Sequence, residues 1–81
     1  MLTNPTRYAL IALRYLTWGW HNNVVLASTE IAERYGINVR TLSPALQRLV
    51  TAGVLRSRRG GSKAGYILAR DPAEITMLDV L

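Results

Sequence analysis

The 81-residue sequence contains no cysteine, a single histidine and only five acidic residues against ten lysines and arginines. Without cysteine, neither a disulfide framework nor a thiolate metal site can form within these residues. His21 stands among asparagines without a second histidine or a carboxylate cluster, so we expect a loop histidine and not a metal ligand. The acids are separated, and the glycine-rich stretch lacks the lysine–hydroxyl ending of a nucleotide-binding loop. These absences predict that the chain is not an enzyme, with no catalytic residues, no metal, no cofactor and no evident small-molecule ligand.

The sequence also lacks a long hydrophobic run. No apolar segment approaches the roughly 18 residues of a membrane-spanning helix, because Arg7 and Arg14 interrupt the longest candidate. The N-terminus lacks the basic leader, the apolar block and the small-residue cleavage site of a signal peptide, so we do not expect one. With 49% hydrophobic residues in a short chain, we expect one small globular domain that is cytoplasmic and has no membrane partner.

The positive charge is concentrated in one part of the chain. The formal net charge is +5 and the sequence pI about 10.5. Half of the ten cations follow one another without an acid among them: Arg56, Arg58, Arg59, Lys63 and Arg70. A one-sided basic patch on a small domain favours a polyanionic partner such as double-stranded DNA. The alternative, a merely solvated surface, fits a dispersed charge pattern better.

The N-terminal segment has the pattern of one helix. Asn4-Pro5 is a helix start, because asparagine caps free amides and proline is favourable at the first helical position. Apolar residues at helical spacing continue the helix to about Trp18, and Gly19 is expected to end it. Residues 20–23 are predicted as a turn and residues 24–26 as a short strand.

The aromatic residues are expected to take part in packing. We expect Trp18 and Trp20 to close the core beneath the first loop, although an exposed tryptophan would mark a partner surface. Tyr8 and Tyr66 are expected to pack in the core or the sheet instead of stacking on bases.

Residues 28–53 have the spacing of a helix–turn–helix. Ser28 is expected to cap the first helix of the pair and Asn38 the second. Gly36 supplies the positive φ that a tight helix C-terminus requires, and Gly53 ends the second helix. The second helix of such a pair is built to lie in a major groove. Its predicted buried stripe consists of Leu42, Ala45, Leu46, Leu49 and Val50.

Pro44 leaves two alternatives for the start of that second helix. If the helix begins at Val39, Pro44 removes the amide that would bond to the Arg40 carbonyl, at a cost of order 3 kcal/mol. If Ser43 caps a shorter helix, Pro44 is its first residue, where its missing amide needs no partner. In either case we expect Pro44 to act on the shape of the helix and not on a base.

Residues 54–58 and 66–68 are strand-like and flank the glycine-rich basic segment 59–65. This pattern predicts a β-hairpin with a long basic tip. Together with residues 24–26, the hairpin makes the small sheet of a winged helix–turn–helix. The fold class expected is therefore mainly α with a small β-hairpin.

Asp71-Pro72 interrupts the chain, so we assign the DNA-binding domain to residues 1–72. Residues 73–81 have the pattern of an amphipathic helix, predicted to be the truncated start of a linker or dimerisation helix. Its apolar residues either support a homodimer through this C-terminal segment or fold back on the first helix: Ile75, Met77, Leu78 and Leu81.

Laid out in this way, the chain resembles the Rrf-type family of bacterial winged helix–turn–helix transcriptional regulators, which includes IscR, NsrR and CymR. The resemblance covers nearly the whole length and rests on five segments in order: Met1-Leu2-Thr3 with Arg7-Tyr8-Ala9, Glu30 to Ile37, Leu42 with Leu46 to Leu49 and Ala52 to Leu55, Arg59 to Tyr66, and Ile75 to Leu81. It implies a sequence-specific regulator with its recognition helix in the major groove and its basic wing in the minor groove.

The sequence departs from the family pattern at three places. The wing lacks a proline that many members have and carries an extra residue. Ser43 and Pro44 stand where many members have a glutamate and a glutamine. Members that sense iron–sulfur clusters carry cysteines beyond the wing, and this sequence has none.

The candidate DNA contacts fall into three groups. Base contacts are expected from the early, outward side of the second helix: Arg40, Thr41, Ser43 and Gln47. Minor-groove contacts are expected from the wing: Arg58, Arg59, Ser62 and Lys63. Phosphate contacts are expected near the start of the first helix: Thr3, Thr6 and Arg7. The plainer interpretation is that these are solvated helix residues and cations that keep a hairpin tip soluble.

Two other functions remain open at this point. A winged helix can serve as a protein-interaction module, or it can bind nucleic acid without sequence preference. The basic and polar character of the second helix and the hairpin argues against the first. Binding to different duplex sequences across salt concentration separates these alternatives.

Overall fold

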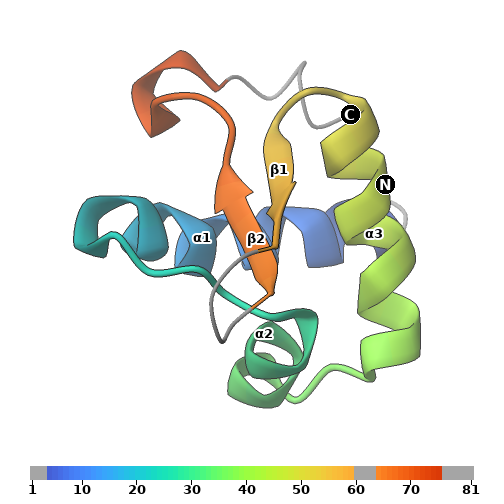
Figure 1. The fold of residues 1–81 in the computed structure, drawn as a ribbon. Helices are drawn as coiled ribbons and strands as arrows, with labels where there is room; N and C mark the ends of the chain where they lie inside the picture. The colour runs from blue at the N-terminus through green and yellow to red at the C-terminus, as the bar shows by residue number, and fades with distance from the viewer. Residues whose placement is uncertain (1–3, 60–63, 76–81) are drawn as a thin grey trace.

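A computed structural model of the chain describes residues 4–59 and 64–75. The elements are α1 (Asn4–Asn22), α2 (Ser28–Tyr35), α3 (Val39–Thr51), β1 (Leu55–Arg58), β2 (Gly65–Leu68) and a short 3-10 helix, η1 (Pro72–Glu74). In Figure 1, α1 lies behind the hairpin and α3 stands beside it. The end of β1 and the start of β2 lie just above α2, and the beginning of α3 lies beside α2 at the lower edge of the molecule. This is the winged helix–turn–helix that the sequence predicts.

α1 is longer than predicted, because it continues through Asn22 and Gly19 lies inside it. A Cβ on Gly19 would come 2.9 Å from the carbonyl oxygen of Val24, so a glycine is needed where the returning chain passes close to the helix. Asn23, with a φ of 56°, ends the helix, and the Val24 amide donates to the Gly19 carbonyl at 2.9 Å. His21 therefore lies in the exposed last turn of a helix and not in a loop.

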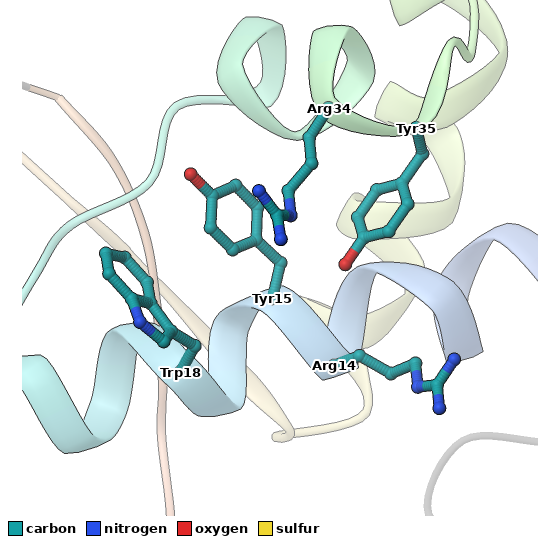
Figure 2. Close-up of a pocket in the computed structure, with 5 residues that line it drawn as sticks. All are labelled: Arg14, Tyr15, Trp18, Arg34 and Tyr35. Carbon is teal, nitrogen blue, oxygen red and sulfur yellow. The ribbon is translucent and has the colours of Figure 1, made fainter.

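Trp18 and Trp20 do not close the core, since their side chains are 48% and 39% exposed. The inward face of α1 includes Leu16 and Gly19, which are both buried and lie at i and i+3 on the same side of the helix. The two tryptophans are rotated away from that face. Trp18 stands beside Tyr15, with the ring centroids 5.5 Å apart (Figure 2).

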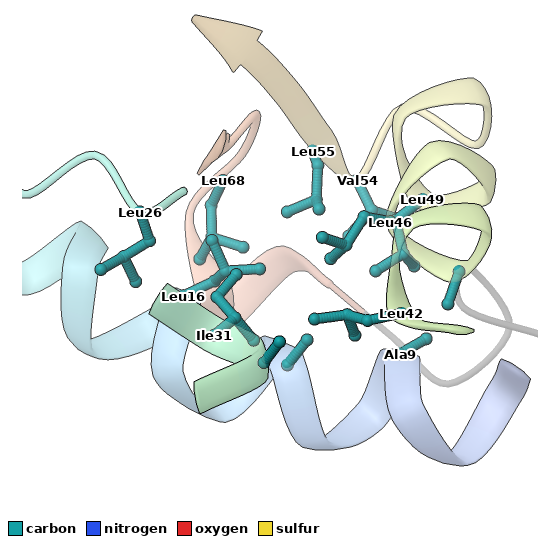
Figure 3. Packing of buried hydrophobic residues seen from close by; sticks show 13 residues of the cluster. Ala9, Leu16, Leu26, Ile31, Leu42, Leu46, Leu49, Val54, Leu55 and Leu68 are labelled. Carbon is teal, nitrogen blue, oxygen red and sulfur yellow. The ribbon is translucent and has the colours of Figure 1, made fainter. Parts of the chain in front are cut away.

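The core lies where α1, α2, α3 and the hairpin meet (Figure 3). It consists of buried apolar side chains: Ala9, Ala12, Leu16, Leu26, Ile31, Ala32, Leu42, Ala45, Leu46, Leu49, Val54, Leu55 and Leu68. The predicted stripe of α3 is confirmed except that Val50 is only partly buried. Tyr8 and Tyr66 pack against this core, as expected. Within residues 4–59 and 64–75, no helix is long and apolar enough to cross a membrane.

The turn between α2 and α3 is formed as predicted. Gly36 has a φ of 64°, and the Ile37 amide donates to the Ala32 carbonyl at 2.9 Å. Asn38 caps α3, because its side-chain oxygen accepts the Arg40 amide at 2.8 Å. These contacts fix the direction in which α3 begins.

The cap of α2 differs from the prediction. The helix begins at Ser28, so the cap residue is Ala27, which has no side-chain acceptor. Instead, the Glu30 carboxylate turns back and accepts the Ala27 amide at 3.1 Å. Ser28 is the first helical residue and not the cap.

The hairpin pairs antiparallel, with Leu55 opposite Leu68 and Arg58 opposite Gly65. The strand expected at residues 24–26 is reduced to one bridge, in which Leu26 and Tyr66 exchange hydrogen bonds of 3.1 and 2.8 Å. Only one residue pairs because the next one, Ala27, is already the cap of α2.

The amphipathic helix predicted after Asp71-Pro72 does not begin at Glu74 or Ile75. Glu74 belongs to η1, whose first free amide, that of Ala73, donates to the Asp71 carboxylate at 2.9 Å. Ile75 is extended, with φ −88° and ψ 123°, and packs against the core. Met77, Leu78 and Leu81 lie outside the described residues, so the boundary at residue 72 and the dimerisation helix stay predictions.

α3 begins at Val39 and contains Pro44, which decides between the two alternatives for this helix. Ser43 lies within the helix and does not cap it. Because Pro44 has no N–H, the Arg40 carbonyl lacks its usual partner in the next turn. The buried stripe and the Asn38 cap hold the first turn in place nevertheless.

We therefore expect Pro44→Gln to raise the free energy of unfolding by about 1–2 kcal/mol. The glutamine supplies the missing amide, and the gain is partly offset because the unfolded chain becomes more flexible. Chemical denaturation followed by circular dichroism measures the change. Ser43→Ala is the control, since a helix-interior serine tolerates alanine whereas loss of a cap costs about 1 kcal/mol. A destabilised Pro44→Gln variant would contradict the role given to the proline.

Candidate nucleic-acid interface

α3 presents a polar side that faces away from the core. Arg40, Thr41 and Gln47 are exposed on it, and Ser43 is partly buried. Arg40 lies in the first turn, where the Asn38 cap fixes the backbone. None of the four candidate base-contact residues belongs to the buried stripe of α3, and helical spacing puts Arg40 and Gln47 on the side opposite to it.

Gln47 is tied to the wing. Its side-chain amide donates to the Tyr66 hydroxyl at 2.9 Å, which joins α3 to β2 across an exposed part of the surface. The sequence gives no signal for this contact, because the two residues are far apart in the chain. The sequence predicted only a base contact for Gln47, whereas the structure also gives its side chain a hydrogen bond to Tyr66.

A hollow of about 290 Å³ lies between α3, the start of α2 and the base of the wing. Gln47 and Arg59, both candidate contacts, line it together. Ser28 and Ser57 line it as well, and their hydroxyls can donate to a phosphate oxygen. The sequence did not single out these two serines, because one was assigned to a cap and the other to a strand.

Arg58 and Arg59 lie on different sides of the wing. Arg58 is the last residue of β1 and lines a separate hollow with Trp20 and Ile67. Arg59 lies with Gln47 instead. The structure thus brings only one of the two arginines to the recognition helix.

Gly65 holds the base of the wing close to the rest of the domain. A Cβ at this position would lie 2.6 Å from the Leu26 carbonyl oxygen, a distance at which the backbone would have to shift. The glycine thus permits the bridge between Leu26 and Tyr66. A larger residue here would move the wing away from α3.

The remaining candidate contacts have varied placements. Thr6 is partly buried and Arg7 exposed, both in the early part of α1. Thr3, Ser62 and Lys63 lie outside the described residues. The phosphate-contact group is therefore represented in the described structure by Thr6 and Arg7.

The chain from residue 34 to residue 70, which includes α3 and the hairpin, contains no aspartate or glutamate. Seven of the ten cations fall between residue 39, where α3 begins, and residue 70: Arg40, Arg48, Arg56, Arg58, Arg59, Lys63 and Arg70. Arg40, Arg58 and Arg59 are exposed. The potential over the recognition helix and the wing is therefore positive, which suits a polyanion.

Comparison with known proteins gives a consistent result. A family model described as "Rrf2: Iron-dependent Transcriptional regulator" matches residues 2–81. The chain belongs to the Rrf2 family. The resemblance drawn from the sequence is therefore confirmed.

Relatives of this Rrf2 chain include a protein of Aquifex aeolicus (strain VF5) whose name assigns it as an HTH-type transcriptional regulator. The two are 32% identical over 81 residues, which is 100% of this chain and 54% of that protein. Among solved structures, T. potens IscR has a TM-score of 0.86 at 30% identity over 99% of this chain and 57% of that one. CymR, the global cysteine regulator of B. subtilis, has a TM-score of 0.89 at 25% identity over 99% and 60%. The chain thus spans little more than half the length of these relatives.

The family model's description names iron, and the residues of this chain do not fit an iron–sulfur cluster. Such clusters are held by cysteine thiolates, and the sequence has no cysteine. Within residues 4–59 and 64–75, no three histidine, aspartate or glutamate side chains lie together.

Tyr66→Phe removes the hydroxyl that accepts the hydrogen bond from Gln47. We expect a coupling of about 0.5 kcal/mol between Tyr66→Phe and Gln47→Ala in the free energy of unfolding, because each change removes the same exposed contact. Denaturation of the two single variants and the double variant measures it. Strictly additive losses would show that the contact does not tie the wing to α3.

Proposed function

We propose that this chain is the DNA-binding domain of a sequence-specific transcriptional regulator. The observation that carries the proposal is the acid-free surface formed by α3 and the hairpin. The beginning of α3, the end of β1 and the start of β2 are directed toward the same side of the domain, where α2 lies (Figure 1). One duplex can meet both, because a major groove about 12 Å wide admits a helix and the minor groove runs beside it. Membership of the Rrf2 family supports this function.

In this proposal α3 enters the major groove. Arg40 reads a guanine through two hydrogen bonds, and Thr41 and Ser43 reach neighbouring base edges or phosphates. Gln47 shares its amide between the Tyr66 hydroxyl and the DNA, so its role is partly to hold the wing. The capped first turn of α3 keeps these side chains in a fixed register along the groove.

The wing follows the adjacent minor groove. Arg59 is the main contact, because a narrow minor groove concentrates negative potential where an arginine can enter. Arg58, Ser62 and Lys63 complete this group, with Arg58 on the opposite side of the strand contacting a phosphate. Thr3, Thr6 and Arg7 contact phosphates near the start of α1. The hydroxyls of Ser28 and Ser57 add phosphate contacts at the hollow between α3 and the wing.

A regulator of this kind works in the cytoplasm on chromosomal DNA and performs no catalysis. Two-fold operators require paired half-site readers, so we propose a homodimer formed through the segment after residue 72. A single domain binds one half-site weakly.

Duplex binding should depend steeply on salt. About four phosphate contacts predict a loss of affinity of about 100-fold between about 50 and 200 mM salt, because bound cations release counterions. Fluorescence anisotropy with labelled duplexes of several sequences measures the slope and the spread among sequences. A flat salt response argues for a protein-interaction module, and a steep response that is equal for all sequences argues for non-specific binding.

Arg40→Ala and Arg59→Ala should affect different parts of the binding site. We expect Arg40→Ala to relax discrimination at one major-groove position by about 1–3 kcal/mol. Arg59→Ala should weaken binding most on sites with a narrow, A·T-rich minor groove. A panel of single-base duplex variants distinguishes the two patterns.

Arg48→Ala provides the matched control. Arg48 is an exposed arginine in the last turn of α3, and its substitution removes the same charge. Equal, sequence-independent losses from Arg40→Ala and Arg59→Ala would show that the two residues contact only phosphates.

A further inference from the structure

A third hollow, larger than the one between α3 and the wing, lies between α1 and α2. Its volume is about 500 Å³, and we name its lining the arginine–aromatic surface: Arg14, Tyr15, Trp18, Arg34 and Tyr35 (Figure 2). None of these residues lines the hollow between α3 and the wing. The surface therefore needs an explanation of its own.

Aromatic rings hold Arg34 in place. Its guanidinium carbon lies 4.8 Å from the Tyr15 ring centroid and 6.0 Å from that of Tyr35. The two tyrosine rings meet edge to face with centroids 6.2 Å apart. A guanidinium held over a ring is pre-organised, and its N–H donors can still take a carboxylate in two parallel hydrogen bonds.

The surface is cationic without an internal counterion. Within residues 4–59 and 64–75, neither Arg14 nor Arg34 forms an ion pair. Figure 2 shows the Arg14 guanidinium directed away from Arg34, so the two charges are spread along the surface. Beside them Trp18 leaves 48% of its area in solvent. A complementary partner therefore brings a carboxylate together with an apolar group.

We propose that the arginine–aromatic surface is a docking site for an acidic segment of another protein. A carboxylate of that segment pairs with Arg34, and a neighbouring aliphatic or aromatic side chain covers Trp18. Tryptophan, tyrosine and arginine are the residue types that carry most of the binding energy at protein interfaces. A small ligand fits less well, because ligand pockets bury most of the ligand and this one leaves Trp18 half open.

This docking is separate from the proposed DNA binding and does not depend on it. The surface is built by α1 and the end of α2, whereas the proposed DNA contacts come from α3, the wing and the starts of α1 and α2. A regulator with two such surfaces can hold DNA on one and a protein on the other.

The test uses Trp18 as its own probe. Trp20→Phe leaves Trp18 as the sole tryptophan of the chain, which has two. We titrate this variant with a short synthetic peptide of the repeat Glu-Leu-Leu-Glu and with a matched peptide of the repeat Gln-Leu-Leu-Gln. We expect a saturable change in Trp18 emission with a Kd of about 100 µM for the acidic peptide, and affinity at least about tenfold weaker for the neutral one.

Variants assign the binding to this surface. Arg34→Met and Trp18→Leu should each weaken peptide binding at least about tenfold. Because Trp18→Leu removes the fluorescent residue, its binding is measured by the anisotropy of a labelled acidic peptide. Arg48→Met, the same substitution at an exposed arginine of α3, should change it by less than about twofold. Thermal unfolding shows that each variant is folded, and duplex affinity is measured in parallel and should be unchanged in Arg34→Met.

Three results would overturn the proposal. Equal losses from Arg34→Met and Arg48→Met would mean that the peptide responds only to net charge. Loss of duplex affinity in Arg34→Met would place the surface in the DNA interface. A change in Trp18 emission with protein concentration alone, matched by dimers in sedimentation, would mean that a second copy of the chain occupies the site.

Discussion

The arrangement of the domain depends on the backbone pairing of Leu26 with Tyr66. Leu26 belongs to the short connection between α1 and α2, and Tyr66 belongs to β2, so this bridge joins the helical part to the wing. Gly65 allows the close approach, since a Cβ there would meet the Leu26 carbonyl at 2.6 Å. The Tyr66 hydroxyl then accepts from Gln47 and carries the connection on to α3. The wing and the recognition helix therefore share one fixed reference point.

A composite surface follows from this bridge. Arg59 and Gln47 line one hollow only because the wing is held against α3 and the start of α2. A hairpin without that anchor would be a marginally stable element, since two strands alone bury little surface. The rigid base fixes where the wing starts relative to α3, as the proposed reading of two adjacent grooves requires.

The sequence predicted the elements and their polarity well, because those depend on local rules. Gly36 and Asn38 act through their own backbone and side-chain chemistry, so the turn and the cap of α3 are correct. Gly19 was misread because its role is a contact with Val24, which helical periodicity does not encode. The helical spacing of Trp18 relative to the buried residues of α1 could have predicted that Trp18 lies outside the core. The link between Gln47 and Tyr66 is purely tertiary, and no local pattern predicts it.

The domain uses arginine in two physically different ways. Arg59 lies at the end of a strand in an acid-free region, where its charge adds to a broad positive potential and contributes over long range. Arg34 lies over Tyr15, so the ring restricts its geometry and its charge acts at short range on a defined partner. Broad potential suits a regularly charged duplex, whereas a fixed guanidinium beside an exposed indole suits one carboxylate next to one apolar group. Net charge does not distinguish the two arginines, whereas their surroundings support the different roles that we propose for them.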